Sequence, residues 1–232
     1  MINISEYESK IYTDEAGTAL PFRLYDPNLG ANRPLLVFLH GAGERGVDNE
    51  STLNTVSPFA PEHNLELEKY GSFLLAPQCA CDYQWVDTPW ANGSFNQDEV
   101  KISKYLSAAK SLIDSVVEEY KIDKSRIYIM GCSMGGYGTW DMLMRFPGYF
   151  RAAMPICGAA DPSKAHLLAK TPIWTFHGDA DNAVPVSGTR EMYAAVKAAG
   201  GDIIYSEYKD CGHGVWMHVH RAACVYDWLF SR

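Results

Sequence analysis

The sequence predicts an α/β fold in which helices flank a mostly parallel central sheet, with an antiparallel hairpin at the N-terminus. Two observations carry this prediction. Short apolar stretches alternate along the chain with longer segments of helical periodicity. Most of the apolar stretches are continuous, as in strands that helices cover on both faces. Because strand and helix alternate, right-handed crossovers between parallel strands are the natural arrangement.

The first two predicted strands form the hairpin. SKIYTD at 9–14 and LPFRLYDP at 20–27 are strand-like, and the turn-prone segment EAGT separates them. A cluster of turn residues, NLGANRP, then separates the hairpin from the rest of the chain. Further strands are predicted at 35–40, 71–78, 126–133, 150–158, 172–178 and 202–208.

Helical patterns occupy the intervals after several of these strands. The chain contains no repeat, low-complexity tract or linker, so residues 1–232 are expected to form one domain. In open sheets of this kind, ligands bind beyond the carboxyl ends of the strands, and functional residues are therefore expected where the apolar runs stop. The predicted helices span 98–120, 134–146, 187–199 and 215–230.

Composition excludes several classes of partner. The formal net charge of −8 describes an acidic surface, which repels nucleic acid and anionic lipid. The apolar runs are too short to cross a bilayer and the N-terminus is polar, so a cytoplasmic protein without a membrane partner is expected. The six cysteines are expected as reduced thiols, because a chain of this size folds without disulfides. The oligomeric state stays open.

The segment GCSMG at 131–135 has the pattern G-x-S-x-G and lies between a predicted strand and a predicted helix. That context indicates a nucleophile elbow, a sharp turn that raises the serine hydroxyl above the sheet. Glycines two residues before and two after the serine prevent collisions in such a turn. Ser133 is therefore a candidate nucleophile, and Cys132 is expected to pack beneath the turn. From the pattern alone, an ordinary serine in a glycine-rich turn is the alternative.

A serine nucleophile needs a base that removes its proton and an acid that orients that base. HGDADNAVP follows the strand predicted at 172–178 and offers Asp181, although Asp179 competes and helix capping is an alternative role. DCGHGVW follows the strand predicted at 202–208 and offers His213, for which a structural loop histidine is the alternative. Three such residues at three strand ends favour the catalytic interpretation.

These residues make the chain resemble the α/β-hydrolase superfamily over nearly its whole length, in which the order is serine, acid, histidine. Within it the chain is similar to compact serine esterases related to feruloyl esterases and polyhydroxyalkanoate depolymerases, and similar motifs occur in prolyl-oligopeptidase-like catalytic domains. The resemblance implies Asp181, rather than Asp179, as the acid and His213 as the base. The segments that carry it are LHGAGERG (39–46), LLAPQC (74–79), GCSMGGYG (131–138), HGDADNAVP (177–185) and GHGVW (212–216).

The oxyanion hole is expected to combine the backbone N–H of Met134, which follows the nucleophile, with that of Ala42 in the loop after the first central strand. The segment AADPSKAHLLAKT (159–171) is long enough for only one short helix, so no large cap domain is expected. The site is then open or covered by loops.

Aromatic residues on the loops near the strand ends are candidates for a substrate pocket. Trp85 and Trp216 are the candidates, with core packing as the alternative for Trp85. Arg45 is expected to pair with Glu44 and brace the oxyanion loop, and the alternative is contact with a substrate carboxylate or sugar hydroxyl.

The leading hypothesis is a serine carboxylesterase that works through an acyl-enzyme and requires neither a metal nor an organic cofactor. The resemblance implies a small-molecule ester substrate, with a small acyl or cinnamoyl-type group on an alcohol or carbohydrate. A prolyl-oligopeptidase-like peptidase or a thioesterase with the same triad is the alternative. A catalytically silent hydrolase-fold binding protein is a further alternative.

Overall fold

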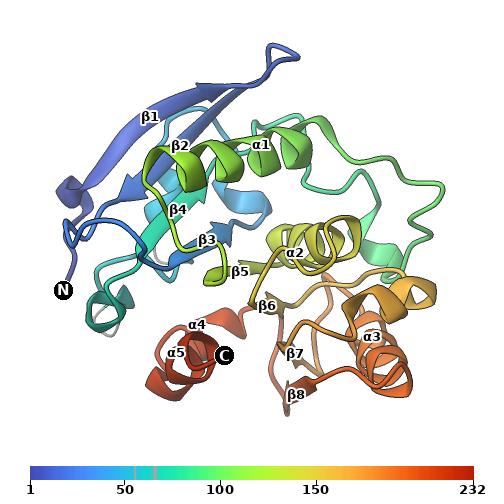
Figure 1. Cartoon of the computed structure of the whole chain (residues 1–232). Coiled ribbons are helices and arrows are strands. Elements are labelled where there is room, and N and C mark those ends of the chain that lie inside the picture. Colours follow the sequence, from blue (N-terminus) through green and yellow to red (C-terminus); the bar gives the residue numbers. More distant parts are fainter. Residues whose placement is uncertain (55, 65–66) are drawn as a thin grey trace.

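The computed structural model describes residues 1–54, 56–64 and 67–232, and its strands form a single mixed sheet (Figure 1). The strand order is β1-β2-β4-β3-β5-β6-β7-β8. The pairs β1–β2 and β2–β4 are antiparallel, and all later pairs are parallel. The strands are β1 (Tyr7–Thr13), β2 (Ala19–Tyr25), β3 (Leu35–Leu39), β4 (Phe73–Pro77), β5 (Ile127–Cys132), β6 (Ala152–Ile156), β7 (Ile173–Gly178) and β8 (Ile203–Tyr208).

This arrangement confirms the predicted fold class and the N-terminal hairpin. Every predicted strand is present and overlaps its predicted range. All residues of β3, β4, β5 and β6 are buried, which explains why these segments are continuously apolar in the sequence.

Helices cover both faces of the sheet (Figure 1). Leu35, Val37 and Leu39 of β3 pack with α1, α2 and α3, whereas Leu36 and Phe38 face the other core with α5. The helices are α1 (Lys104–Glu119), α2 (Met134–Arg145), α3 (Val186–Ala198), α4 (Trp216–Val219) and α5 (Ala223–Phe230). Short 3₁₀ helices are η1 (Ile4–Glu6), η2 (Ala42–Glu44), η3 (Ser51–Leu53), η5 (Glu68–Tyr70), η6 (Trp90–Asn92) and η7 (Pro162–Leu168).

The connection between β6 and β7 holds the one short helix that its length predicted, η7. No described helix is long and apolar enough to span a membrane.

Helix α1 begins six residues later than predicted, at Lys104 rather than at 98. The hydroxyl of Ser103 accepts a hydrogen bond from the backbone N–H of Leu106 at 3.1 Å, which is the N-cap arrangement that serine favours. The Asn96 side chain holds an earlier turn by accepting the N–H of Asp98 at 3.0 Å. Local polar side chains therefore compete with the helix over 98–103.

The single helix predicted at 215–230 is wrong, because the structure has two helices, α4 and α5, with Ala222 extended between them. The buried side chains Val219, His220, Val225 and Leu229 would spread over more than half of the circumference of one continuous helix. A break in the helix allows both parts to bury their apolar side chains.

We expect the fold to lose stability in mild acid, because His40 and His220 are buried. Burial lowers the pKa of His40 to about 4 and that of His220 to about 3. In the unfolded chain both histidines have a pKa of about 6.5. Their neutral forms therefore contribute fully to the free energy of unfolding above that pH, and the free energy of unfolding falls as the pH drops towards the folded-state pKa values. At pH 5 the loss is about 2 kcal/mol for each histidine.

Urea denaturation at pH 7 and pH 5 measures this loss directly. His220→Phe, which preserves an aromatic ring against Phe38, should remove about half of the pH-dependent change. The matched control is His218→Gln at an exposed position, which should preserve the full change. Equal free energies of unfolding at the two pH values would contradict the assignment of two buried neutral histidines.

Candidate active site

The candidate nucleophile lies in a tight turn between β5 and α2. Ser133 has φ 56° and ψ −118°, a backbone conformation that is rare for residues other than glycine. A Cβ atom at Gly131 would lie 2.3 Å from the carbonyl oxygen of Gly135, and one at Gly135 would lie 1.8 Å from that of Leu39. The glycines are therefore needed because backbone segments pass each other closely, as the sequence pattern predicted.

The structure brings Ser133, His213 and Asp181 together from three strand ends. His213 Nε2 lies 2.7 Å from Ser133 Oγ, and His213 Nδ1 lies 2.6 Å from Asp181 Oδ2. The N–H at Nδ1 donates to the carboxylate, which leaves the Nε2 lone pair free to accept the serine proton. The serine is 8 % exposed, so the hydroxyl is shielded but still borders a cavity.

The carboxylate of Asp181 is strongly held in its charged form. Burial raises the pKa of Asp181, but hydrogen bonds from His177 and His213 and from the backbone N–H groups of Val184 and Ala183 outweigh it. The pKa therefore lies well below its usual range. The two N–H groups donate to Oδ1 at 3.0 and 2.9 Å, so the orientation of the carboxylate is fixed.

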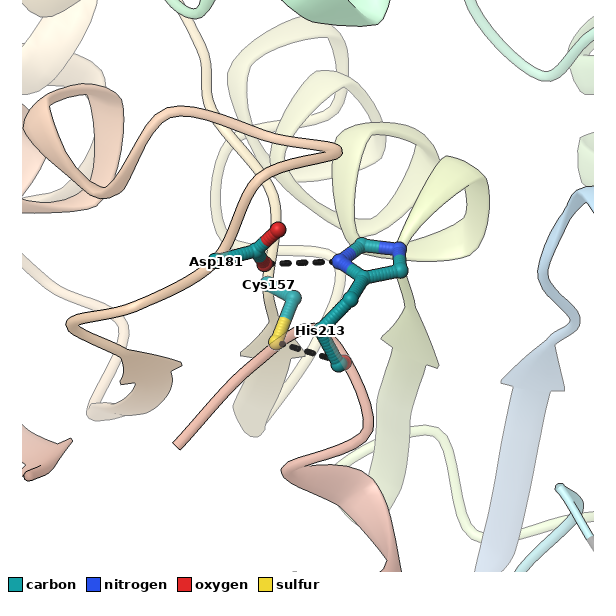
Figure 2. A group of neighbouring side chains, drawn as sticks. All are labelled: Cys157, Asp181 and His213. Carbon is teal, nitrogen blue, oxygen red and sulfur yellow. Dashed lines mark hydrogen bonds and ion pairs between the residues drawn. The ribbon is translucent and has the colours of Figure 1, made fainter. Parts of the chain in front are cut away.

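Figure 2 shows Cys157 beneath the contact between Asp181 and His213. The Cys157 thiol donates to the backbone carbonyl of His213 at 3.6 Å and so supports the loop that carries the histidine. One ligand-type atom from each of the three residues lies within 4.8 Å of the others. Burial raises the pKa of the thiol well above its usual value, which disfavours the thiolate that a metal ion would need.

A cavity of about 230 Å³ adjoins the nucleophile. Its walls come from residues 41–44, Val56, Ser133, His213 and Trp216. Ala42 lines this cavity, and Met134 directly follows the nucleophile at the start of α2. Their expected role as oxyanion donors stays a prediction.

The loop that carries Ala42 is held from two sides. The indole N–H of Trp85 donates to the backbone carbonyl of His40 at 3.0 Å, and Arg45 Nε donates to that of Ala42 at 2.9 Å. His40 itself donates from Nδ1 to the carbonyl of Gly41 and accepts the N–H of Cys79 at Nε2. These bonds fix the loop before a substrate arrives.

Two expectations are wrong: that Trp85 lines the pocket and that Arg45 pairs with Glu44. Trp85 has no exposed surface and packs in the core, so it supports the loop and does not line the pocket. No ion pair joins Arg45 to Glu44 among the described residues: Arg45 reaches backbone carbonyls and the Trp90 ring, while Glu44 is buried and faces Asn54. Arg45 therefore braces the loop as expected, but through the backbone.

Trp216 lies where the sequence predicted, beside the candidate base. Its ring meets that of His213 edge-on, with centroids 5.0 Å apart. Cys132 is fully buried beneath the turn, as expected. The sequence reasoning missed His177, which lies 3.1 Å from Asp181; its position four residues before the acid, at a strand end, was the available signal.

A second, larger cavity of about 700 Å³ borders the loop of the candidate acid. Arg45, Trp90, Asp87 and Gln84 line it, together with Ala183. The guanidinium of Arg45 lies over the ring of Trp90, 5.7 Å from its centroid. An aromatic plane with charged and amide groups around it suits a polar ligand.

Comparisons with known proteins find a matching family model and several relatives. Residues 28–223 match the family model of phospholipases and carboxylesterases. A probable carboxylesterase of Oryza sativa subsp. japonica is 27% identical over 79% of this chain and 73% of its own. A bifunctional acetylxylan esterase/xylanase of Neocallimastix patriciarum is 26% identical over 75% of this chain.

The crystal structure of a thermostable esterase is similar over 98% of this chain, with a TM-score of 0.87 and 35% identity. This chain spans 63% of the length of that esterase and 23% of the length of the bifunctional protein.

Proposed function

The chain belongs to the phospholipase/carboxylesterase family of α/β-hydrolases, and we propose that it hydrolyses carboxylic esters through an acyl-enzyme at Ser133. The observation that carries the proposal is the continuous contact from Asp181 through His213 to Ser133, with distances of 2.6 and 2.7 Å. This is the arrangement that activates a serine hydroxyl for acyl transfer.

In the proposed reaction, Ser133 Oγ attacks the ester carbonyl while His213 Nε2 takes the hydroxyl proton. His213 then donates that proton to the departing alcohol oxygen. Water attacks the acyl-enzyme with His213 again as base, and His213 returns the proton to Ser133 Oγ as the bond between Oγ and the acyl carbon breaks and the acid is released. Asp181 stabilises the imidazolium that forms in both steps, and the N–H groups of Met134 and Ala42 are proposed to stabilise the oxyanion.

The two cavities support a substrate with a short acyl group and a larger alcohol. The cavity at Ser133, about 230 Å³, is below the range typical of pockets for drug-sized ligands, whereas the second cavity, about 700 Å³, is within it. We propose that the acyl group occupies the first cavity and that the second takes the alcohol. The Trp90 ring and the Arg45 guanidinium favour a polar alcohol such as a carbohydrate, and one relative is named an acetylxylan esterase.

Initial rates with p-nitrophenyl esters from acetate to octanoate test the proposal, with methyl ferulate and a p-nitroanilide peptide alongside. The shortest esters should give the highest kcat/KM and the peptide should give none. If every substrate is inert while a fluorophosphonate labels Ser133, the triad is intact and the ester class is wrong. Absence of labelling would favour a catalytically silent protein.

A variant of the acyl cavity gives a sharper prediction. Val56→Ala enlarges the cavity at Ser133 and should raise the ratio of butyrate to acetate kcat/KM by about tenfold, since one or two methylenes are worth 1–3 kcal/mol. The control is Val47→Ala, because Val47 is 74% exposed and does not line the cavity. An unchanged ratio in Val56→Ala would place the acyl group elsewhere.

A further inference from the structure

His177, at the carboxyl end of β7, is fully buried and lies next to the candidate acid. Its Nε2 atom lies 3.1 Å from the backbone carbonyl oxygen of Val184 and 3.1 Å from Asp181 Oδ2. A carbonyl and an ionised carboxylate can only accept hydrogen bonds. The Nε2 atom must therefore carry a proton, because its lone pair would otherwise face two oxygen atoms.

The other ring nitrogen of His177 faces the hydroxyl of Thr189, which donates its proton to a different group. His177 Nδ1 lies 2.7 Å from Thr189 Oγ1, and this hydroxyl donates to the backbone carbonyl of Gly158 at 2.7 Å. A threonine hydroxyl has one proton to give, so towards His177 it accepts. The Nδ1 atom must then be a donor as well.

We infer that His177 is a buried imidazolium, and that it acts as a positioning residue for the triad acid. This inference rests on the proposed function of Asp181. Oδ2 of Asp181 then accepts from two imidazole rings, because His213 Nδ1 lies 2.6 Å away. The cation fixes the carboxylate against rotation and offsets part of its charge.

The other ionisable groups around this pair leave Asp181 as the principal charge facing His177. On β8 the register partner of His177 is Glu207, whose carboxylate is bound by both Arg190 Nε and Nη2 at 2.8 and 2.7 Å. Burial raises the pKa of the Cys157 thiol and of the Tyr137 hydroxyl, so both are neutral. The ionisable groups that surround His177 and Asp181 are His213, Glu207, Arg190, Cys157 and Tyr137.

A cation on the far side of Asp181 changes the chemistry of His213. Protonation of His213 places a second positive charge beside the same carboxylate, and the two cations repel each other. The protonation of His213 is therefore less favourable. The base therefore stays free to a lower pH than it would beside an isolated carboxylate. Once formed, the imidazolium is also a stronger acid, which favours proton transfer to the departing alcohol.

Thr189→Val tests the inference through the pH profile. Without an oxygen to accept from Nδ1, His177 should release that proton and become neutral. The negative charge of Asp181 is then no longer offset by a cation on His177, so it stabilises the protonated form of His213 more strongly. The acid limb of kcat/KM should move upward by about one pH unit, because a single nearby charge shifts titrations by that order. Thr189→Ser keeps the hydroxyl and should restore the wild-type limb.

The matched control is Thr175→Val, on the same strand as His177. The Thr175 hydroxyl is also buried and donates to a backbone carbonyl, that of Pro155 at 2.9 Å, but it does not touch His177. Its loss should lower stability without moving the acid limb. An unmoved limb in folded Thr189→Val protein would overturn the inference.

Two readouts are independent of the substrate class. The pH dependence of the rate at which a fluorophosphonate labels Ser133 reports the same limb, even if no ester proves to be a substrate. Nitrogen-15 NMR of histidine-labelled wild-type protein reports each ring nitrogen of His177 directly, whether or not Thr189→Val folds. Two protonated nitrogens at pH 7 support the inference, and one unprotonated nitrogen overturns it.

Discussion

Replacing Ser133 with alanine should lower kcat/KM for the best ester by about 10,000-fold or more, because His213 then has no hydroxyl to activate. The residual rate should come from the oxyanion donors and substrate binding alone. Initial rates at high enzyme concentration measure the loss, and thermal unfolding shows that the variant is folded. Activity within tenfold of wild type would move the nucleophile to another residue.

The turn makes a second serine variant informative. Both Ser133→Ala and Ser133→Gly lack the hydroxyl, but only glycine adopts φ 56° without steric cost. Strained residues of this kind cost about 1–3 kcal/mol, so the glycine variant should be more stable than the alanine variant by about that amount. Equal stabilities would mean that the turn carries little strain. The two variants thus separate the chemical role of the residue from its cost to the fold.

Gly135→Ala should prevent stable folding, although it adds only a methyl group. The new Cβ atom would lie 1.8 Å from the carbonyl oxygen of Leu39, inside van der Waals contact with the backbone of β3. Relief would require α2 to move away from the sheet, in a region that is buried throughout. We expect a loss of at least about 4 kcal/mol, which is much of the stability of an ordinary domain.

Soluble yield and urea denaturation measure this effect, with Gly214→Ala as the control. A Cβ atom at Gly214 meets no atom within 4 Å, and the backbone there is not left-handed, so this substitution should change the free energy of unfolding by less than about 1 kcal/mol. If Gly135→Ala were as stable as its control, the close approach of α2 to β3 would be contradicted.

Continuously apolar runs made most of the sheet predictable, because strands buried on both faces leave that pattern. The ends of helices were less predictable, for physical reasons that involve particular residues. Ser103 and Asn96 use their side chains to hold backbone turns, and this overrides the helical periodicity over 98–103. The break at Ala222 comes from the need to bury two sets of side chains, which one periodic pattern does not distinguish.

The relative positions of Ser133, Asp181 and His213 could be anticipated because each ends a strand, and parallel strands bring such ends together. The directions in which individual side chains point could not be anticipated from the sequence. Trp85 stands near a strand end as a pocket residue would, but it turns inward to hold a carbonyl group. Arg45 lies beside Glu44 in sequence, yet its guanidinium donates to the backbone carbonyls of Ala42 and Tyr83.

The close contact of α2 with the sheet also decides where this protein can be re-engineered. Cβ atoms at Gly135 and Gly136 would strike the backbones of β3 and β6, so mutant libraries directed at the elbow would consist mainly of misfolded protein. Gln84, Asp87, Trp90 and Ala91 line the larger cavity, and each of these residues is at least partly exposed. Directed evolution of alcohol selectivity should therefore randomise these four positions and leave the elbow and the buried Trp85 unchanged.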